Sequence, residues 1–270
     1  MTPDAGHSAA VLFDTHAHLA HADFAADREE VLKRARAAGV RYILNAGWDL
    51  ASSAEAAAMA DPGQGLYAAV GIHPHDAARA PADYLERLRD LARRPGVVAL
   101  GEIGLDYHYD FSPRDTQRRL FAEQLALAGE LGLPVLVHDR EAHADTLAAL
   151  RQEAERRGTG TVQGVMHCYS GSREMAADFL GLGLLLGVGG PLTFANARRV
   201  VEVAEAVPLS ALVIETDCPY LAPAPYRGKR NEPAYVVRVA EALAGVRGLA
   251  LAEVAEATTA NARRMLGLDR

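Results

Sequence analysis

Short apolar runs alternate along the chain with longer segments in which apolar residues recur every three or four positions. The runs have the length and composition of strands buried on both faces, and the longer segments have the period of amphipathic helices. Turn and capping residues separate the two, as at Gly39 and at Asp61-Pro62-Gly63. Strands are therefore predicted at 11–14, 41–45, 66–70, 97–101, 135–138, 164–167, 184–188 and 212–215.

A helix is predicted after each strand, and a last amphipathic segment, 251–266, is expected to pack on the outside. Eight strand and helix alternations favour an α/β chain folded as a (β/α)₈ TIM barrel, regular or distorted, over an open doubly wound sheet. A seven-stranded barrel is the alternative. The predicted helices are 28–38, 51–60, 81–92, 115–131, 142–156, 172–180, 196–206 and 233–244.

Length and composition suit one domain, because half of the 270 residues are apolar. We expect a mobile leader at 1–10, a single domain at 11–270 and a monomer. The two cysteines are too few for a disulfide framework and the leader has no secretory pattern, so a cytoplasmic location is expected. No apolar run approaches the roughly 20 residues that a membrane helix needs, so no membrane insertion is expected.

The formal net charge of -7 comes from 35 acidic and 28 basic residues. This charge argues against a protein that coats nucleic acid through a broad basic surface. It is compatible with a small site that binds one strand end.

The first predicted strand leads into Asp14-Thr15-His16-Ala17-His18. Side chains alternate along a strand, so His16 and His18 leave the backbone on one side and can bind one metal ion. The alternative is that the two histidines are ordinary polar residues of the surface, or that their spacing in a loop is a coincidence.

Similar residues follow other predicted strands. Catalytic side chains of such barrels project from the carboxyl ends of the strands, which meet at one rim. The convergence of histidines and carboxylates after five strands predicts a metal centre there. The six candidate ligands are His16, His18, Glu102, His138, His167 and Asp217.

This ligand set limits the metal. Imidazoles and carboxylates without a thiolate suit zinc, manganese, magnesium or cobalt. Six ligands exceed the need of one catalytic ion, so we expect two divalent ions, such as Mg, Mn or Zn, that share Glu102. His16, His18 and Asp217 are assigned to one ion, and His138 and His167 to the other.

Other residues near the rim are assigned by position. His73 and His75 end the strand at 66–70, and His73 is expected to contact the substrate; a structural histidine next to Pro74 is the equal alternative. Cys168 and Cys218 are expected to be buried structural thiols rather than nucleophiles.

The segment 226–233 carries three cations between the last predicted strand and its helix. Its place above the rim favours phosphate binding over a solvated loop. Arg140, two residues after His138, is a further candidate. The expected phosphate contacts are Arg227, Lys229, Arg230 and Arg140.

Several motifs are jointly specific: Asp-Thr-His-Ala-His-Leu at 14–19, Gly-Ile-His-Pro-His at 71–75, Gly-Glu-Ile-Gly-Leu-Asp-Tyr at 101–107, His138, His-Cys-Tyr-Ser-Gly at 167–171, Glu-Thr-Asp-Cys-Pro-Tyr-Leu at 215–221 and Arg-Gly-Lys-Arg-Asn-Glu-Pro at 227–233. From 11 to 268 the chain resembles the TatD deoxyribonucleases. The resemblance implies a barrel of the amidohydrolase superfamily, a divalent-metal-dependent deoxyribonuclease activity, a cytoplasmic setting and a role in DNA processing or repair. It also gives the six candidate ligands their metal-binding role, with no departure at any of them.

The leading hypothesis is 3′–5′ exonuclease cleavage of phosphodiester bonds in single-stranded DNA by a metal-activated water, with Asp217 as general base and Glu102 shared between the ions. Because the family is biochemically mixed, an alternative is an amidohydrolase-type enzyme that hydrolyses a small amide, lactone or ester. A third reading is a non-catalytic barrel that binds nucleic acid or a protein and uses metal for stability.

Overall fold

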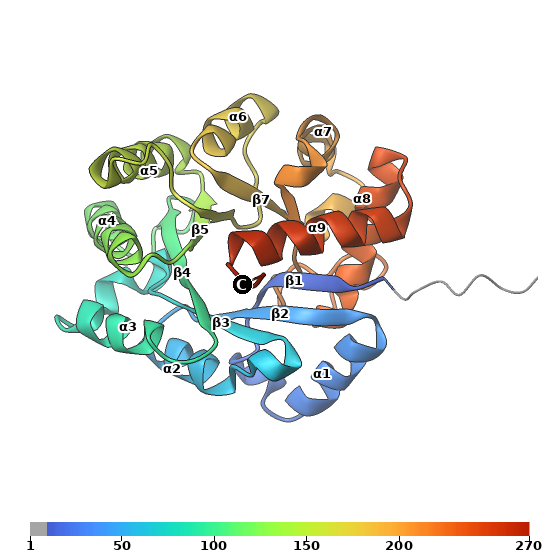
Figure 1. Cartoon of the computed structure of the whole chain (residues 1–270), viewed down its shortest axis with the longest axis horizontal. Helices are drawn as coiled ribbons and strands as arrows, with labels where there is room; N and C mark the ends of the chain where they lie inside the picture. Colours follow the sequence, from blue (N-terminus) through green and yellow to red (C-terminus); the bar gives the residue numbers. More distant parts are fainter. Residues whose placement is uncertain (1–9, 270) are drawn as a thin grey trace, which may run out of the picture.

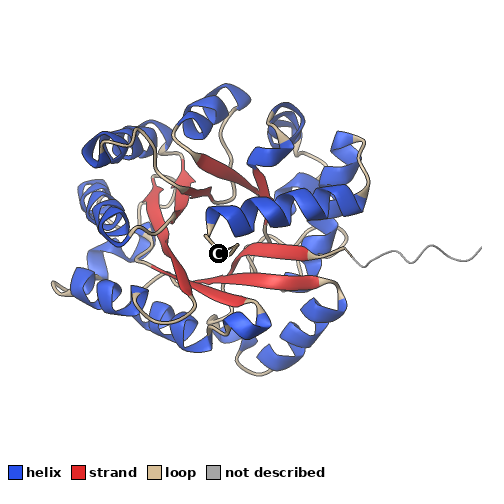
Figure 2. Ribbon diagram, in the orientation of Figure 1, coloured by secondary structure: helices blue, strands red, loops and turns tan. Residues whose placement is uncertain are grey.

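Eight parallel strands stand side by side in sequence order in the computed structural model, which describes residues 10–269. Figures 1 and 2 show them as an inner ring surrounded by helices. The strands are β1 Leu12–Ala17, β2 Val40–Ala46, β3 Leu66–Val70, β4 Val97–Asp106, β5 Val135–Arg140, β6 Gly164–Met166, β7 Leu184–Val188 and β8 Leu212–Ile214. The predicted α/β barrel is confirmed.

Local chemistry accounts for the ends of several helices. Asp49 and Ser52 form a reciprocal capping box at the start of α2, and left-handed Gly132 and Gly158 end α4 and α5. The helices are α1 Arg28–Ala37, α2 Leu50–Met59, α3 Tyr84–Ala92, α4 Arg114–Leu131, α5 His143–Arg157, α6 Arg173–Gly181, α7 Arg198–Ala206, α8 Val236–Arg247 and α9 Leu251–Met265. No helix within residues 10–269 is long and apolar enough to cross a membrane.

The barrel closes between β1 and β8 through an isolated parallel bridge that pairs Ala17 with Cys218. The backbone nitrogen of His18 donates to the carbonyl of Cys218 at 2.8 Å, and that of Asp217 donates to the carbonyl of His16 at 2.9 Å. The backbone contact that closes the barrel therefore also places His16, His18 and Asp217 side by side.

A separate apolar cluster fills the inside of the barrel and includes Phe13, Leu44 and Leu136. Ala262 of α9 and Leu266, the residue that caps its C-terminus, belong to this cluster. Figure 1 shows α9 lying across one end of the barrel with the C-terminus near its centre. The expectation that 251–266 packs on the outside was incomplete, because the last turn of the helix also covers the barrel's amino end.

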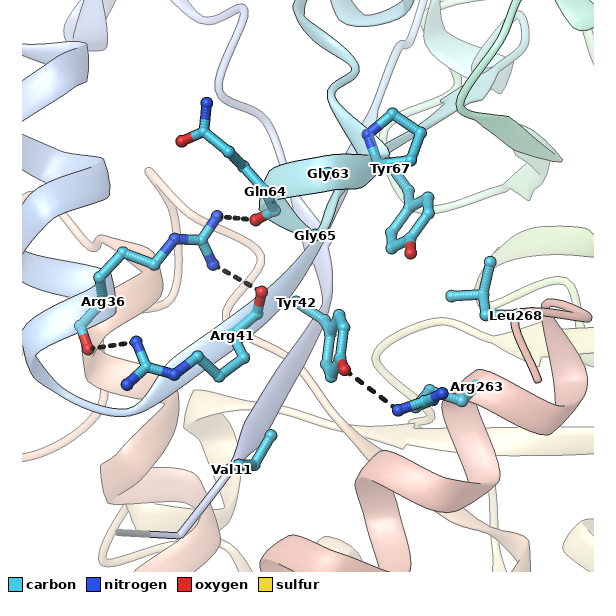
Figure 3. A pocket seen from close by; sticks show the side chains of 11 residues that line it. Val11, Arg36, Arg41, Tyr42, Gly63, Gln64, Gly65, Tyr67, Arg263 and Leu268 are labelled. Carbon is cyan, nitrogen blue, oxygen red and sulfur yellow. Dashed lines mark hydrogen bonds between the residues drawn. The ribbon is translucent and has the colours of Figure 1, made fainter.

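A pocket of about 430 Å³ lies at this amino end, between the starts of β2 and β3 and the end of α9 (Figure 3). Arg36 donates to the carbonyl oxygens of Val40 and Arg41 at 3.0 and 2.6 Å. Arg263 donates to the hydroxyl of Tyr42 at 3.0 Å and to Asp269 at 2.8 Å. Both guanidinium groups are thus already satisfied within the protein.

The predicted and observed strands differ most at β4. The prediction ended this strand at 101, directly before Glu102, whereas β4 continues to Asp106. A register shift between Leu100 and Ile103 lets the strand resume its pairing with β5 beyond the irregularity. Glu102 therefore projects from inside a strand rather than from its end. The predicted leader lies, except for Ala10, outside the described residues.

Candidate metal centre

The six predicted ligands meet at the carboxyl end of the barrel. Three of them stand on strands, namely His16 on β1, Glu102 on β4 and His138 on β5. The others, His18, His167 and Asp217, lie in the segments after β1, β6 and β8. Each has a side-chain nitrogen or oxygen within 4.0 Å of another member of the set.

The side chains of His16 and His18 converge, with their Nε2 atoms close together. Their Nε2 atoms are 3.2 Å apart. The Nε2 of His16 is 3.2 Å from Oε2 of Glu102, and the Nε2 of His18 is 3.4 Å from Oδ1 of Asp217. Nδ1 of His18 lies 3.0 Å from the carbonyl of Ala46, which orients the ring and leaves Nε2 free to coordinate.

Glu102 faces different histidines with its two oxygens. Its Oε2 faces His16 and, at 3.5 Å, His18. Its Oε1 is 2.9 Å from Nδ1 of His138 and 3.9 Å from Nε2 of His167. One carboxylate is therefore shared between two sets of imidazoles, as a bridging ligand would be.

Among residues 10–269, three groups of side chains could hold a metal ion, because the donor atoms within each group lie within 4.8 Å of one another. One of them includes His73, whose Nε2 is 3.6 Å from Oε1 of Glu102. The sequence assigned His73 to the substrate, and its ligand-like position was missed because it lies beyond the end of β3, as the N-cap of the short 3₁₀ helix Pro74–Arg79. The groups are His16–His18–Asp217, His16–Glu102–His167 and His73–Glu102–His138.

Asp106, which sequence reasoning missed, contacts the rings of His138 and His75. Its Oδ2 is 3.0 Å from Nε2 of His138 and 2.9 Å from Nε2 of His75. This contact turns Nδ1 of His138 toward Glu102. Asp106 follows Glu102 by four residues in β4, and that spacing was the available indication, because residues four apart in a strand share a side.

Glu215, also missed, lies behind His167. Its Oε1 is 3.1 Å from Nδ1 of His167 and accepts a 2.5 Å hydrogen bond from the backbone nitrogen of Cys168. A Cβ atom on Gly187 of β7 would lie 2.5 Å from Oε2 of Glu215, so glycine there makes room for the carboxylate. The indication in the sequence was Glu215 standing two residues before Asp217.

Burial and neighbouring charges shift the pKa values of Glu102, His138 and His167 in opposite directions. Burial raises the pKa of Glu102, but the histidines around it, His16 first, outweigh burial and hold this pKa well below its usual value. Burial lowers the pKa of His138 and of His167, yet the neighbouring carboxylates raise these values to about 9 and about 10. The carboxylates thus favour positive charge on these nitrogens, whether a proton or a metal ion supplies it.

The donor set fits a divalent metal. Buried imidazole and carboxylate groups with fixed orientation suit Zn²⁺ and other borderline or hard ions. Nδ1 of His16 has no hydrogen-bond partner within residues 10–269, so no protein group in that range fixes its protonation. Asp217 keeps 15% of its side chain exposed, and the site is therefore open to water on that side.

The four predicted phosphate contacts have different surroundings. Arg140 is exposed, with its guanidinium 4.8 Å from the ring centre of Tyr109, and Arg227 lies 4.0 Å over the ring of Phe194. Lys229 is exposed. Arg230 differs, because it donates to both carboxylate oxygens of Asp27 at 2.8 and 2.7 Å.

Neither cysteine has the surroundings of a nucleophile. Cys218 is fully buried and Cys168 is half-buried. Burial raises the pKa of both thiols well above the usual value, so both stay protonated.

Comparisons with known proteins agree with this arrangement. The model of the family described as TatD related DNase matches residues 13–267. A metal-dependent hydrolase of Bacillus subtilis, YabD, is 43% identical over 259 residues, which are 96% of this chain and 100% of the relative. A Klebsiella pneumoniae protein named 3′-5′ ssDNA/RNA exonuclease TatD is 39% identical over 266 residues, covering 96% of this chain and 98% of that protein.

Among solved structures, the Escherichia coli TatD homologue YJJV superposes with a TM-score of 0.87 at 35% identity. The match covers 94% of this chain and 97% of that structure. Fold, buried ligand set and near full-length similarity agree, and the chain belongs to the TatD family of metal-dependent hydrolases.

Proposed function

We propose that the protein is a nuclease that hydrolyses phosphodiester bonds at the ends of single-stranded DNA in the 3′–5′ direction. The observation that carries this proposal is Glu102, whose two oxygens face two sets of histidines. The similarity to the Klebsiella pneumoniae protein that is named a 3′-5′ ssDNA/RNA exonuclease supports the substrate and the polarity. The cytoplasmic setting, the role in DNA repair and the monomeric state stay predictions.

We assign two divalent ions, Mg, Mn or Zn, to the centre. His16, His18 and Asp217 would hold one ion, His138 and His167 the other, and Glu102 both. The position of His73 makes it a further ligand candidate on the second side. Ions bound there would lower the pKa of a water and neutralise phosphate oxygens.

Asp217 is the group best placed to take a proton from the attacking water. Burial raises the pKa of Asp217, but His167 first and then His18 outweigh burial, so the pKa lies below its usual value and the carboxylate is ionised. It is also partly open to solvent, unlike Glu102. An ionised carboxylate that water can reach fits the general base expected here.

Arg140, Arg227 and Lys229 are proposed to bind backbone phosphates beside the centre. Their side chains form no ion pair within the part of the chain that the structure describes. Arg230 is left out of this set because Asp27 already occupies its donors.

The deciding experiment uses protein stripped of metal and reloaded with Mg²⁺, Mn²⁺ or Zn²⁺ separately. Single- and double-stranded DNA and RNA, each labelled at the 3′ or the 5′ end, are then assayed beside a chromogenic ester. We expect loss of 3′-terminal nucleotides from single-stranded DNA with at least one of the ions. Intact oligonucleotides together with ester cleavage would contradict the nuclease proposal.

The second candidate is hydrolysis of a small amide, lactone or ester. The net charge of -7 favours it, since an acidic protein repels nucleic acid at long range. The ester arm of the same experiment tests it directly.

A further inference from the structure

Exposed apolar side chains gather at the metal end of the barrel. Within residues 10–269, the large apolar residues that are at least 40% exposed are Val11, Tyr109, Phe111, Tyr220 and Leu221. All except Val11 lie in the segments after β4 and β8, at the end that carries the ligands. Single exposed apolar residues are ordinary, but grouping beside a polar centre is typical of binding sites.

The first group is a pair of stacked rings, Tyr109 and Phe111, which we call the β4 platform. The rings are 5.2 Å apart and inclined by 20°, and they are 47% and 66% exposed. The edges of both meet His75, at 5.4 and 4.8 Å. Arg140 covers Tyr109, and its guanidinium forms no hydrogen bond or ion pair within residues 10–269.

The loop that carries the β4 platform is fixed at both ends. Oδ1 of Asp106 accepts hydrogen bonds from the backbone nitrogens of His108 and Tyr109 at 3.0 and 2.9 Å. The hydroxyl of Ser112 donates to the carbonyl of His75 at 3.0 Å. The same Asp106 orients His138, so the platform is tied to the metal ligands. Its exposed rings are therefore pre-positioned rather than left in a loose loop.

The second group contains Tyr220, Trp48 and His21, which we call the β8 platform. The ring of His18 lies 5.4 Å from Trp48 and 6.2 Å from Tyr220. The amide of Asn231 donates to the carbonyl of Tyr220 at 2.7 Å and thereby fixes the backbone beneath its ring. Trp48 also lines a cavity of about 480 Å³ between the segments after β2 and β3.

The two platforms lie beside different parts of the metal centre. The β8 platform contacts His18, whereas the β4 platform contacts His75, whose ring is 4.3 Å from His73 and 6.0 Å from His138. A strand that places a phosphate at the centre can therefore reach one aromatic surface on each side. Flat rings accept every base and are worth about 1–3 kcal/mol per stacked base, which suits binding of single strands without regard to sequence.

We propose that the β4 and β8 platforms are two nucleobase-binding subsites that hold the bases on the two sides of the scissile phosphate. This inference rests on the proposed nuclease function. Arg140, over Tyr109, would contact the phosphate that follows the base stacked on the β4 platform.

The test pairs protein variants with single-stranded oligonucleotides that lack one base. Each oligonucleotide is intact or abasic at one of the two nucleotides that flank the scissile phosphate. The variants are Tyr109→Ala/Phe111→Ala and Tyr220→Ala. Tyr109→Phe/Phe111→Tyr keeps both rings, and Val11→Ala removes an exposed apolar side chain at the other end of the barrel.

In the wild type, either abasic position should raise KM about tenfold. Tyr109→Ala/Phe111→Ala should raise KM on the intact strand about tenfold and abolish the penalty at one abasic position while retaining it at the other. Tyr220→Ala should show the opposite preference. Tyr109→Phe/Phe111→Tyr should retain both abasic penalties, because both rings remain. Val11→Ala should leave KM within about twofold of wild type.

Failure of this inference differs from failure of the proposed function. If the wild type cleaves all strands and missing bases leave KM unchanged, or if the variants keep both penalties, the subsites are refuted and the nuclease stands. If no strand is cleaved, the nuclease proposal fails. Fluorescence anisotropy with the same oligonucleotides then decides the subsites, and equal affinity for intact and abasic strands, or no affinity, refutes them.

Discussion

Charged side chains have different kinds of partner at the two ends of the barrel. At the amino end, Arg36 donates to backbone carbonyls, and the buried Glu153 of α5 pairs with Arg156 and Arg157. At the carboxyl end, Glu102 is surrounded by histidines, with no arginine or lysine within ion-pair distance among the described residues. Charges at the first end are matched by permanent partners, whereas the carboxylate at the centre of the metal site is matched only if the histidines are protonated or bind a cation.

We infer from this difference that the paired charges at the amino end contribute to stability, whereas the charges of the metal centre contribute to activity. A side chain with a permanent partner contributes chiefly to the folded state. A carboxylate among imidazoles is costly without a cation, so its contribution depends on what binds there. Variants at the amino end should therefore change the free energy of unfolding, and variants at the carboxyl end should change catalysis and metal binding.

The largest expected effect comes from Glu102→Gln. Removing the shared carboxylate takes a charge away from both sets of histidines, so kcat/KM should fall at least about 10³-fold, equivalent to several kcal/mol of transition-state stabilisation. Metal content, measured by inductively coupled plasma mass spectrometry, should fall as well.

Glu153→Gln is the matched control, since it changes an equally buried carboxylate at the other end of the barrel. We expect kcat/KM within about twofold of wild type and a loss of about 1–3 kcal/mol in the free energy of unfolding. If Glu153→Gln lost activity as Glu102→Gln does, the contrast between the two ends would be wrong.

Asp217→Asn should have the next largest effect. It keeps the shape of the side chain but removes the proposed proton acceptor, so kcat on single-stranded DNA should fall at least 10²-fold, which is roughly the loss typical of a missing general base. Metal content measured in parallel separates lost proton transfer from a lost ligand. Activity within about threefold of wild type would remove Asp217 from the proposed mechanism.

The fold was predictable because its pattern is local. The strands at 66–70 and 184–188 match β3 and β7 residue for residue, since turn residues or glycines flank both apolar runs. The extension of β4 past Glu102 was not predictable, because it depends on a register shift against β5. The contribution of α9 to the barrel interior was also hidden, because an amphipathic pattern identifies an apolar face but not what that face covers.

The candidate site shows the same limit. Six ligands could be proposed because each follows or ends an apolar run, and the structure brings them together. Spacing along the chain indicated Asp106 and Glu215 as candidates but not their partners, because His138 and His167 belong to other strands and their following segments. The ligand-like position of His73 likewise depends on Glu102 of another strand. Arg230 was placed with the phosphate contacts because it stands beside Lys229, and its partner Asp27 lies 203 positions away.

Asp106→Asn and Glu215→Gln test how the metal ligands are oriented, because these carboxylates contact the rings of His138 and His167. Outer carboxylates of this kind typically contribute about 10–100-fold to metal affinity, so we expect that loss in a metal titration. Activity should recover in part when metal is in excess. Unchanged metal affinity in both variants would mean that neither carboxylate positions a ligand.

The smallest effect is expected from substituting the exposed cations, and the same kind of substitution can be made at both ends of the barrel. Replacing Arg140, Arg227 and Lys229 with glutamine should raise KM on single-stranded DNA about tenfold. Loss of up to three phosphate contacts should also reduce the slope of log affinity against log salt by up to about two, since each contributes about 0.7 for single strands. Arg41→Gln with Arg263→Gln removes two cations at the amino end and should leave KM and the salt slope unchanged. Equal changes in both variants would mean that overall charge, and not position at the rim, governs binding.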